Sequence, residues 1–319
     1  MKAAVVQAAG KSPIYADFAA PVPASDEHRV TVTAAALSQV VKSRASGAHY
    51  SSPGRFPFVV GIDGVGRLDD QTRVYFVLPT APYGSMAEQT VVPAEQCLPL
   101  PDGLDDTTAA AIANPGMSSW AAFKERAKLK AGETVLVNGA TGTAGRLAVQ
   151  IAKYLGARKV IATGRNADTL RSVTALGADV TIPLVENEEL FEAELKKQFA
   201  AGVDVVIDYL WGKSAERLLI AATKAGAEAM PIRFVQIGSV SGSNITLPSA
   251  VLRSSAIELM GSGINSIPRQ RLVEGIDGVL QAATPGGFQI ATKVAALSDV
   301  ERVWSTDDGT RRTVFRVGV

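Results

Sequence analysis

A glycine-rich turn is the segment whose residue types and spacing most directly suggest chemistry. An apolar run leads into NGATGTAG (138–145), and an amphipathic segment follows. In this order Gly139 would permit a tight turn, Gly142 would let a pyrophosphate approach the backbone, and Gly145 would let the next helix pack closely. The pattern is typical of a dinucleotide site, although three glycines can also serve only the backbone conformation of a tight turn, with no ligand.

The backbone amides at the start of the following helix would complete such a site. Amides at that position have no partner within the helix, and the helix dipole favours negative charge beside them. We therefore expect phosphate contacts from the residues of the turn, which are Thr141, Thr143 and Ala144.

The end of the next strand distinguishes the two nicotinamide dinucleotides. A site that prefers NAD usually carries Asp or Glu there, about 20 residues beyond the glycines. Here the strand ends in Gly164, which would leave room for the ribose, and Arg165, which offers a fork of donors to a phosphate. NADP is therefore favoured, although Arg165 can also be interpreted as a solvated arginine at a helix start. Arg171 could assist the phosphate, but a solvated face is the simpler interpretation.

The elements that must position this turn lie between residues 118 and 255. Apolar strands alternate there with helices of about 10–15 residues, which gives βαβ units. Right-handed crossovers then require a parallel sheet with helices on both faces. We therefore predict a doubly wound α/β domain of the Rossmann type over residues 118–255.

The flanking segments have a different pattern. Short β-rich runs separated by Pro and Gly precede residue 110, which indicates a compact β-rich barrel or sandwich. Residues 106–129 look like two helices joined by a bend at Pro115. After Leu252 we expect a helix over 253–263, another over 268–283 and two final strands, too few for a third domain. The predicted β-rich domain therefore combines residues 1–117 and 256–319.

Composition excludes several classes of protein. The 319 residues include 32 Lys and Arg against 31 Asp and Glu, and a net charge of +1 gives no electrostatic case for binding nucleic acid or a membrane. No apolar run is long enough for a signal peptide or a membrane span, so we expect a cytoplasmic protein. Cys97, His28 and His49 are the only residues of their types, which excludes a disulfide framework and a zinc site of several Cys and His ligands.

Several longer segments carry a family resemblance. They are MKAAVV (1–6), PFVVGIDGVG (57–66), YGSMAEQTVVPA (83–94), LPDGLDDTTAAAI (100–112), NGATGTAG (138–145), GVDVVIDYL (202–210) and FVQIGSVSG (234–242). Together they resemble the zinc-free quinone oxidoreductase branch of the medium-chain dehydrogenase/reductase superfamily, along almost the whole chain. The resemblance implies a groES-like catalytic domain formed from both chain ends, a Rossmann domain between them, NADP(H) as cofactor and commonly a homodimer. Residues 239–252 could offer an edge strand for that dimer.

Two departures from the relatives bear on mechanism. Zinc-binding relatives carry Gly-His-Glu where this chain has Gly61-Ile62-Asp63, and a four-cysteine lobe that Cys97 alone cannot provide. We therefore expect no metal and no zinc-bound alkoxide chemistry. Zinc-free relatives usually carry Asn and Asp where Ser38 and Val41 stand, so whatever those polar groups do is altered here.

The resemblance also implies roles for residues outside the glycine turn. Relatives carry a tyrosine near Tyr50, which we expect to contact the substrate and to donate a proton, with an ordinary loop tyrosine as the alternative. Relatives also imply cofactor contacts at two further places, the domain junction (Asn114 and Ser118) and the turn after a later strand (Gly238 and Ser239).

Two more candidates lie near strand ends. Tyr209 follows the fourth strand of the nucleotide domain, at the carboxyl edge where ligands bind in such sheets. Arg312 stands in a segment that resembles the Gly-Lys-x-Val of relatives, in which the basic residue reaches the cofactor. An exposed arginine at a strand edge is the alternative for Arg312.

Hydride transfer is the reaction class that remains. With no metal and no Ser-His-Asp set, the cofactor would deliver hydride while the protein supplies placement and electrostatics. A quinone or an α,β-unsaturated carbonyl suits this reaction, because its oxygen gains charge that hydrogen-bond donors can stabilise. We therefore expect an NADPH-dependent oxidoreductase. The alternatives are a double-bond reductase for one metabolite and an NADPH-binding sensor or regulatory protein with little catalytic activity.

Overall fold

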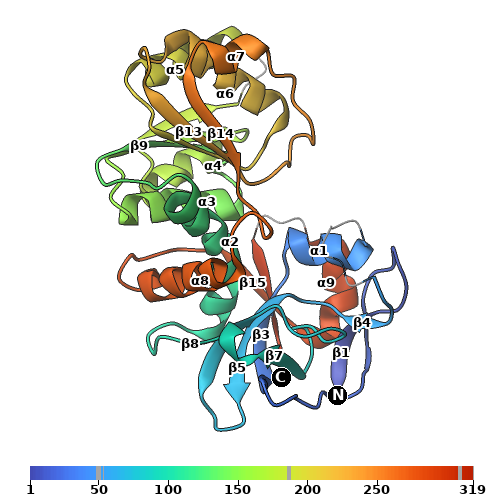
Figure 1. The fold of residues 1–319 in the computed structure, drawn as a ribbon. Coiled ribbons are helices and arrows are strands. Elements are labelled where there is room, and N and C mark those ends of the chain that lie inside the picture. The colour runs from blue at the N-terminus through green and yellow to red at the C-terminus, as the bar shows by residue number, and fades with distance from the viewer. Residues whose placement is uncertain (48–51, 53, 185–187, 308–310, 319) are drawn as a thin grey trace. The chain divides into compact units, whose positions relative to one another are not determined.

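The computed structural model describes residues 1–47, 52, 54–184, 188–307 and 311–318. The chain forms two compact units, Met1–Asn114 with Ile290–Val319 (unit 1) and Pro115–Gln289 (unit 2). Figure 1 shows the helices and strands of both units. Within the described ranges, no helix is long and apolar enough to cross a membrane.

Unit 2 is built on a six-stranded parallel sheet in the order β11-β10-β9-β12-β13-β14. Numbered within the unit, this order is 3-2-1-4-5-6, which is the Rossmann arrangement. The predicted doubly wound α/β fold is therefore confirmed. The strands are β9 (Thr134–Asn138), β10 (Lys159–Gly164), β11 (Val180–Pro183), β12 (Val205–Asp208), β13 (Pro231–Gln236) and β14 (Ala256–Gly261).

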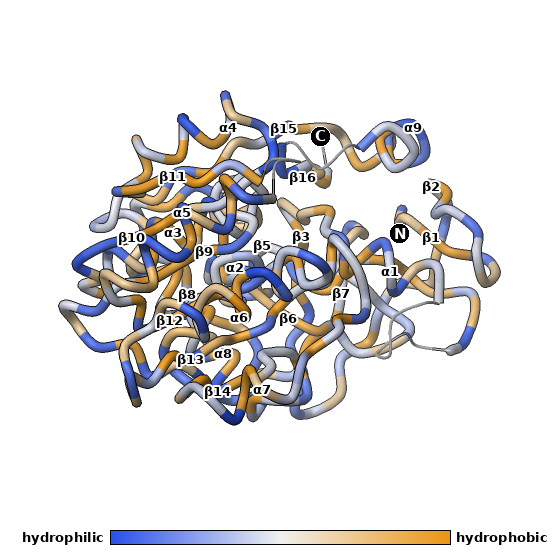
Figure 2. The backbone as a smooth tube through the Cα atoms, turned by 90° about the horizontal axis from the view of Figure 1, so that it is seen from above, coloured by the Kyte–Doolittle hydropathy of each residue, from blue (hydrophilic) through white to orange (hydrophobic). Residues whose placement is uncertain are grey.

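Helices cover both faces of this sheet. Apolar residues of α5, α6 and α7 form one core with the strands, and α3 packs against β9 and β10 on the other side (Figure 1). The strands are largely hydrophobic (Figure 2), as expected for a parallel sheet that is buried on both faces. The helices are α3 (Thr143–Tyr154), α4 (Ala167–Ser172), α5 (Glu188–Ala200), α6 (Gly212–Ala225), α7 (Ser249–Arg253) and α8 (Arg269–Ala283).

Residues 253–289 fold differently from the expectation. The helix expected over 253–263 is wrong, because residues 256–261 form β14, which pairs in parallel with β13 along its whole length. A short apolar run fits either element, and the free edge of β13 decides in favour of a strand. Since β14 and α8 both fold with unit 2, its second boundary follows residue 289 rather than residue 255. Residues 239–252 contain no strand, so the edge strand on this side is β14.

Helix α2 (Asp106–Ala121) runs through Pro115 without a break, so the expected pair of helices is also wrong. Proline removes one helical hydrogen bond, but most of this helix is buried and its packing overrides the local signal. The boundary between the two units lies inside α2, after Asn114, whereas the sequence predicted it after residue 117.

Unit 1 contains two sheets. One has the order β2-β1-β4, and the other has the order β15-β16-β3-β5-β6-β8, with β7 paired to β3. Because β16 pairs antiparallel with β3, the two ends of the chain share one sheet. The elements are β1 (Lys2–Val6), β2 (Ile14–Asp17), β3 (Glu27–Ala36), α1 (Gln39–Ser46), β4 (Phe58–Val59), β5 (Asp63–Leu68), β6 (Arg73–Val77), β7 (Gln89–Pro93), β8 (Cys97–Pro99), β15 (Thr292–Ala296), α9 (Val300–Thr306) and β16 (Arg312–Arg316).

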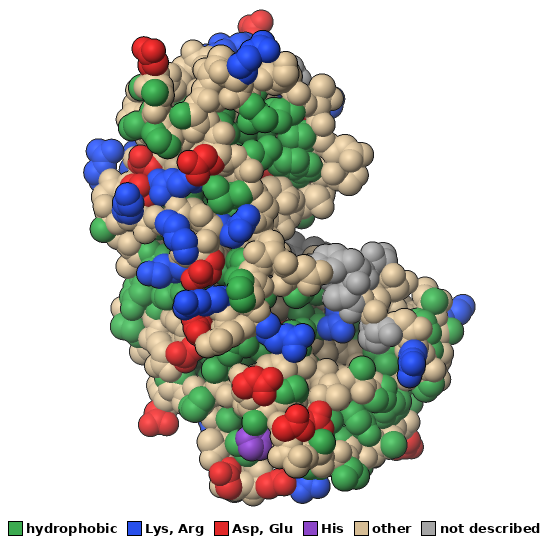
Figure 3. All heavy atoms as spheres, in the orientation of Figure 1, with side chains coloured by type: hydrophobic (Ala, Val, Ile, Leu, Met, Phe, Trp, Pro, Cys, Tyr) green, Lys and Arg blue, Asp and Glu red, His purple; other side chains and the backbone are tan. Residues whose placement is uncertain are grey.

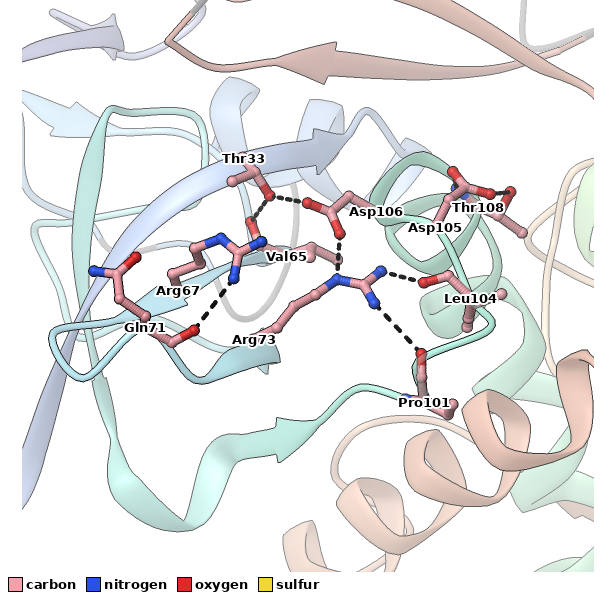
Figure 4. Close-up of polar contacts among 10 residues, drawn as sticks. All are labelled: Thr33, Val65, Arg67, Gln71, Arg73, Pro101, Leu104, Asp105, Asp106 and Thr108. Carbon is pink, nitrogen blue, oxygen red and sulfur yellow. Dashed lines mark hydrogen bonds and ion pairs between the residues drawn. The ribbon is translucent and has the colours of Figure 1, made fainter.

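The start of α2 is fixed to the second of these sheets by charge-assisted hydrogen bonds (Figure 4). Asp106 accepts from Arg73 Nε and from Thr33 Oγ1, each at 2.6 Å. Arg73 also donates to the carbonyl oxygens of Pro101 and Leu104. One guanidinium thus holds the carboxylate of α2 and the loop before it, and bonds of this kind are stronger than neutral ones.

Candidate dinucleotide-binding site

The three glycines of the turn between β9 and α3 have three different surroundings. Gly139 has φ +89°, a conformation that favours glycine. A Cβ on Gly145 would lie 2.2 Å from the carbonyl oxygen of Gly139, so the helix start packs directly on the turn. A Cβ on Gly142 would meet only that same oxygen, at 3.8 Å. Gly142 therefore faces open space, where the sequence predicts a pyrophosphate.

The start of α3 offers hydrogen-bond donors to that space. Among the described residues, the backbone N–H groups of Thr141, Thr143 and Ala144 have no acceptor, whereas Ala140 donates to the carbonyl oxygen of Thr163 at 2.8 Å. The three residues are partly exposed and Gly142 is exposed. Unpaired amides at the positive end of a helix dipole are a ready site for an anion.

The end of β10 lies next to this turn. A Cβ on Gly164 would lie 2.3 Å from Cγ2 of Thr141, so a glycine here lets the turn pack closely against the strand end. The room for a ribose at Gly164 stays a prediction. Arg165 is exposed, and its guanidinium has no partner in the described part of the chain. Arg171 instead pairs with Asp168, which agrees with a solvated face.

A buried polar network joins the carboxyl ends of three neighbouring strands. Thr163 donates to Asn138 Oδ1 at 2.6 Å, and the same hydroxyl accepts from the N–H of Gly139 at 3.2 Å. Asn138 Nδ2 donates to Asp208 Oδ1 at 2.8 Å. Burial raises the pKa of Asp208, while hydrogen bonds from the Leu210 amide and Asn138 lower it. Sequence reasoning missed this network, although each of its three side chains is the last or next-to-last residue of an apolar strand.

Tyr209 and Ser118 come together within unit 2. Their hydroxyl oxygens are 3.3 Å apart, and Ser118 Oγ also donates to the carbonyl oxygen of Pro115 at 2.7 Å. Burial raises the pKa of Tyr209 to about 12, so its hydroxyl keeps its proton at neutral pH. Tyr209 is buried rather than at the surface, which limits any ligand contact to its exposed edge.

The loop after β13 packs closely against the backbone of Tyr209. A Cβ on Gly238 would lie 2.6 Å from the carbonyl oxygen of Tyr209, so this glycine serves a close backbone approach. Ser239, the next residue, is exposed. The roles that the sequence gave to Ser118, Tyr209, Gly238 and Ser239 toward a cofactor stay predictions.

Unit 1 holds a buried cluster of ionisable groups. Tyr75 donates to Asp63 Oδ2 at 2.7 Å, while Asp63 Oδ1 has no hydrogen-bond partner among the described residues. Arg312 is close enough that its charge lowers the pKa of Asp63. The Nε and Nη2 atoms of Arg312 are buried, and neither has a hydrogen-bond partner in the described ranges. β16 lies between β15 and β3, so an exposed strand-edge position for Arg312 is wrong. Burial outweighs both partners and raises the pKa of Asp63 to about 6.

The structure shows no site contact for the remaining predicted residue that it describes, Asn114. Asn114 is half-buried in α2 of unit 1, with no side-chain hydrogen bond to any described residue. Tyr50 and His49 lie outside the described residues. Among the residues that are described, no three His, Cys, Asp or Glu side chains gather where they could hold a metal ion.

The sheet order of unit 2 and the glycine turn between its first strand and helix define a dinucleotide-binding domain. Comparisons with known proteins agree. A family described as zinc-binding dehydrogenase matches residues 144–287. A probable NADPH-dependent quinone reductase of Emericella nidulans, tdiC, is 31% identical over 93% of this chain and 94% of that protein. Prostaglandin reductase-3 of Bos taurus is 30% identical over 66% of this chain and 58% of that protein.

Solved structures extend the similarity to the whole chain. A quinone oxidoreductase from Thermus thermophilus superimposes with a TM-score of 0.81 at 26% identity, covering 99% of this chain and 100% of that one. A mycobacterial quinone oxidoreductase gives 0.85 at 21% identity and 99% coverage of both chains, which supports the fold. The chain belongs to the medium-chain dehydrogenase/reductase superfamily, in its quinone oxidoreductase branch.

The buried carboxyl of Asp63 predicts a pH dependence of stability. Its pKa is about 6 in the folded chain against an ordinary value of 3.8, so between these values the folded state binds more protons and stability falls as the pH rises. We expect the free energy of unfolding of the wild type, relative to D63N, to fall by about 2–3 kcal/mol between pH 4 and pH 7. Urea unfolding of both proteins at several pH values measures this.

D69N is the matched control, because Asp69 is an exposed carboxylate that pairs with Arg29. Its pH profile should stay nearly parallel to that of the wild type. If D63N also ran parallel to the wild type, Asp63 would not titrate near pH 6.

Proposed function

We propose that the protein is an NADPH-dependent oxidoreductase that transfers hydride to a quinone or an α,β-unsaturated carbonyl compound. The observation that carries this proposal is the group of amides beside the open position of Gly142, with Arg165 at the end of the adjacent strand, none of which has a partner among the residues that the structure describes. The names of relatives, among them an NADPH-dependent quinone reductase, support the same activity. NADPH, when bound, supplies the hydride.

The chain's own residues would bind the two charged parts of that cofactor separately. The amides of Thr141, Thr143 and Ala144 suit the pyrophosphate, because they are already oriented and have no competing acceptor among the described residues. Arg165 suits the 2′-phosphate, because a guanidinium matches phosphate geometry with two parallel donors. Further proposed contacts are Gly139, Gly164, Asn114, Ser118, Tyr209, Gly238, Ser239 and Arg312.

The acceptor would need donors for the charge that develops on its oxygen. We propose Tyr50 for this role, as the sequence predicted. We also propose that the reaction is zinc-independent, because Ile62 stands where zinc-binding relatives carry a histidine, and the chain has one cysteine and two histidines.

A regulatory NADPH-binding protein with little activity is not favoured, since the relatives named above are reductases. Nucleic acid is also a poor partner. Figure 3 shows Lys and Arg interspersed with Asp and Glu over the face in view, and the net charge is +1. A homodimer, for which β14 offers an open sheet edge, stays a prediction, and light scattering can check it. The cytoplasmic location also stays a prediction.

The activity is tested with a panel of quinones and enones, followed by the loss of NADPH absorbance. We expect turnover of at least one class, with NADPH preferred to NADH. Turnover of a single enone without any quinone would identify the narrower double-bond reductase. No turnover of either class would overturn the proposal.

The phosphate site is tested by R165A. Removing the guanidinium should raise the Kd for NADPH about 10- to 100-fold and change that for NADH less than about threefold, because only NADPH carries the 2′-phosphate. Fluorescence titration of both cofactors measures the difference. R171A is the matched control, since Arg171 is an exposed arginine already paired with Asp168. Equal losses for both cofactors in R165A would contradict the assignment.

G142A tests the pyrophosphate half of the site. It adds a methyl group, whereas R165A removes a side chain. Its φ is −75°, and a Cβ there meets only the Gly139 oxygen at 3.8 Å, so the melting temperature should not change. The methyl group would occupy the space proposed for the pyrophosphate, which both cofactors share. We therefore expect affinity for NADPH and NADH to fall together, by about 10-fold or more. Undiminished binding would mean that the pyrophosphate lies elsewhere.

A further inference from the structure

A small cavity in unit 1 is lined by α1, by residues 58–62 and by the loop that contains Pro82 and Tyr83. Its volume is about 30 Å³. Pro82 is exposed, so the cavity opens to solvent on that side. Arg44 and Tyr83 are the polar side chains among the described residues that line it, and the other lining side chains are apolar.

In the part of the chain that the structure describes, Arg44 has no partner for its charge. Its Nε is buried without a hydrogen-bond acceptor, and no described carboxylate forms an ion pair with the guanidinium. No Asp or Glu lies among the described residues that line the cavity. Burial lowers the pKa of Arg44, yet a guanidinium stays protonated in proteins. The described part of the fold therefore holds a partly buried cation beside a cavity and supplies no carboxylate to pair with it.

We propose that this cavity is a subsite for a carboxylate group of the compound that the enzyme reduces, with Arg44 as the residue that pairs with it. This assignment rests on the proposed function. Arg44 becomes a specificity-determining residue, which favours acidic quinones or enones over neutral ones. Tyr83, whose hydroxyl bonds no described residue, supplies a second donor at the same cavity.

Size and chemistry favour a carboxylate over other anions. A cavity needs about 10–15 Å³ to hold one water molecule, so this one, at about 30 Å³, accepts two or three atoms of about that size. The two oxygens of a carboxylate fit that space and match the fork of a guanidinium, whereas a phosphate group is larger. The apolar walls then suit the carbon atoms that carry the carboxylate. A buried cation gains more from such a partner than an exposed one does, because water screens it less.

The test compares 4-(3-oxobut-1-enyl)benzoate with its methyl ester, which differ in the charge and carry the same enone. We expect R44A to raise KM for the acid about 10- to 100-fold and to change KM for the ester less than about threefold. R44K should recover part of the loss for the acid, because a lysine keeps the charge without the fork. R44Q provides a second neutral variant if R44A fails to fold. R253A, which removes an exposed arginine of unit 2, should behave as wild type.

Calorimetric titration of the same acid without NADPH separates this proposal from the proposed function. If neither compound is reduced but the wild type binds the acid and R44A does not, the subsite stands while the activity fails. If the wild type does not bind the acid more tightly than the ester, or if R44A and R44Q bind it as well as the wild type, the subsite is overturned.

Discussion

The buried hydrogen bonds among Asn138, Thr163 and Asp208 are the constraint on which the nucleotide site depends. They join the carboxyl ends of β9, β10 and β12, which lie side by side in the sheet. Thr163 also accepts from the N–H of Gly139, so the first residue of the turn is tied to the second strand. Each of these groups is fully buried, and a buried polar group without a partner costs about 1–3 kcal/mol. The network therefore fixes where the turn leaves the sheet.

The same network holds a strained backbone. Trp211 has φ +57° and ψ −153°, a conformation that is almost restricted to glycine and costs about 1–3 kcal/mol. Its N–H donates to the carboxylate of Asp208, as does the N–H of Leu210. Leu210 in turn packs against Gly139, where a Cβ would lie 2.9 Å from its side chain. The carboxylate thus shapes the chain after β12, and that chain closes one side of the glycine turn.

The sequence predicted most of unit 2 because its signals are local. Alternating strands and helices required a parallel sheet, and NGATGTAG with Arg165 could be recognised without knowing what lies beside them. The failures arise where distant contacts decide. The run 256–261 becomes a strand only because β13 offers an open edge, and α2 continues through Pro115 only because its surroundings bury it. Likewise Asp63 and Arg312 come from opposite ends of the chain, and no spacing rule pairs them.

Arg44 and Arg312 are both partly buried in unit 1, and their electrostatic surroundings differ. Arg312 has the charge of Asp63 near it, so its cation is balanced within the unit and the two residues act on stability together. Arg44 has no such partner among the described residues, and its burial is a cost that nothing in the described fold offsets. Replacing an unbalanced buried charge should not destabilise a protein, whereas replacing a balanced one should. This contrast is the physical reason to assign Arg44 to ligand binding and Arg312 first to the architecture of its own sheet.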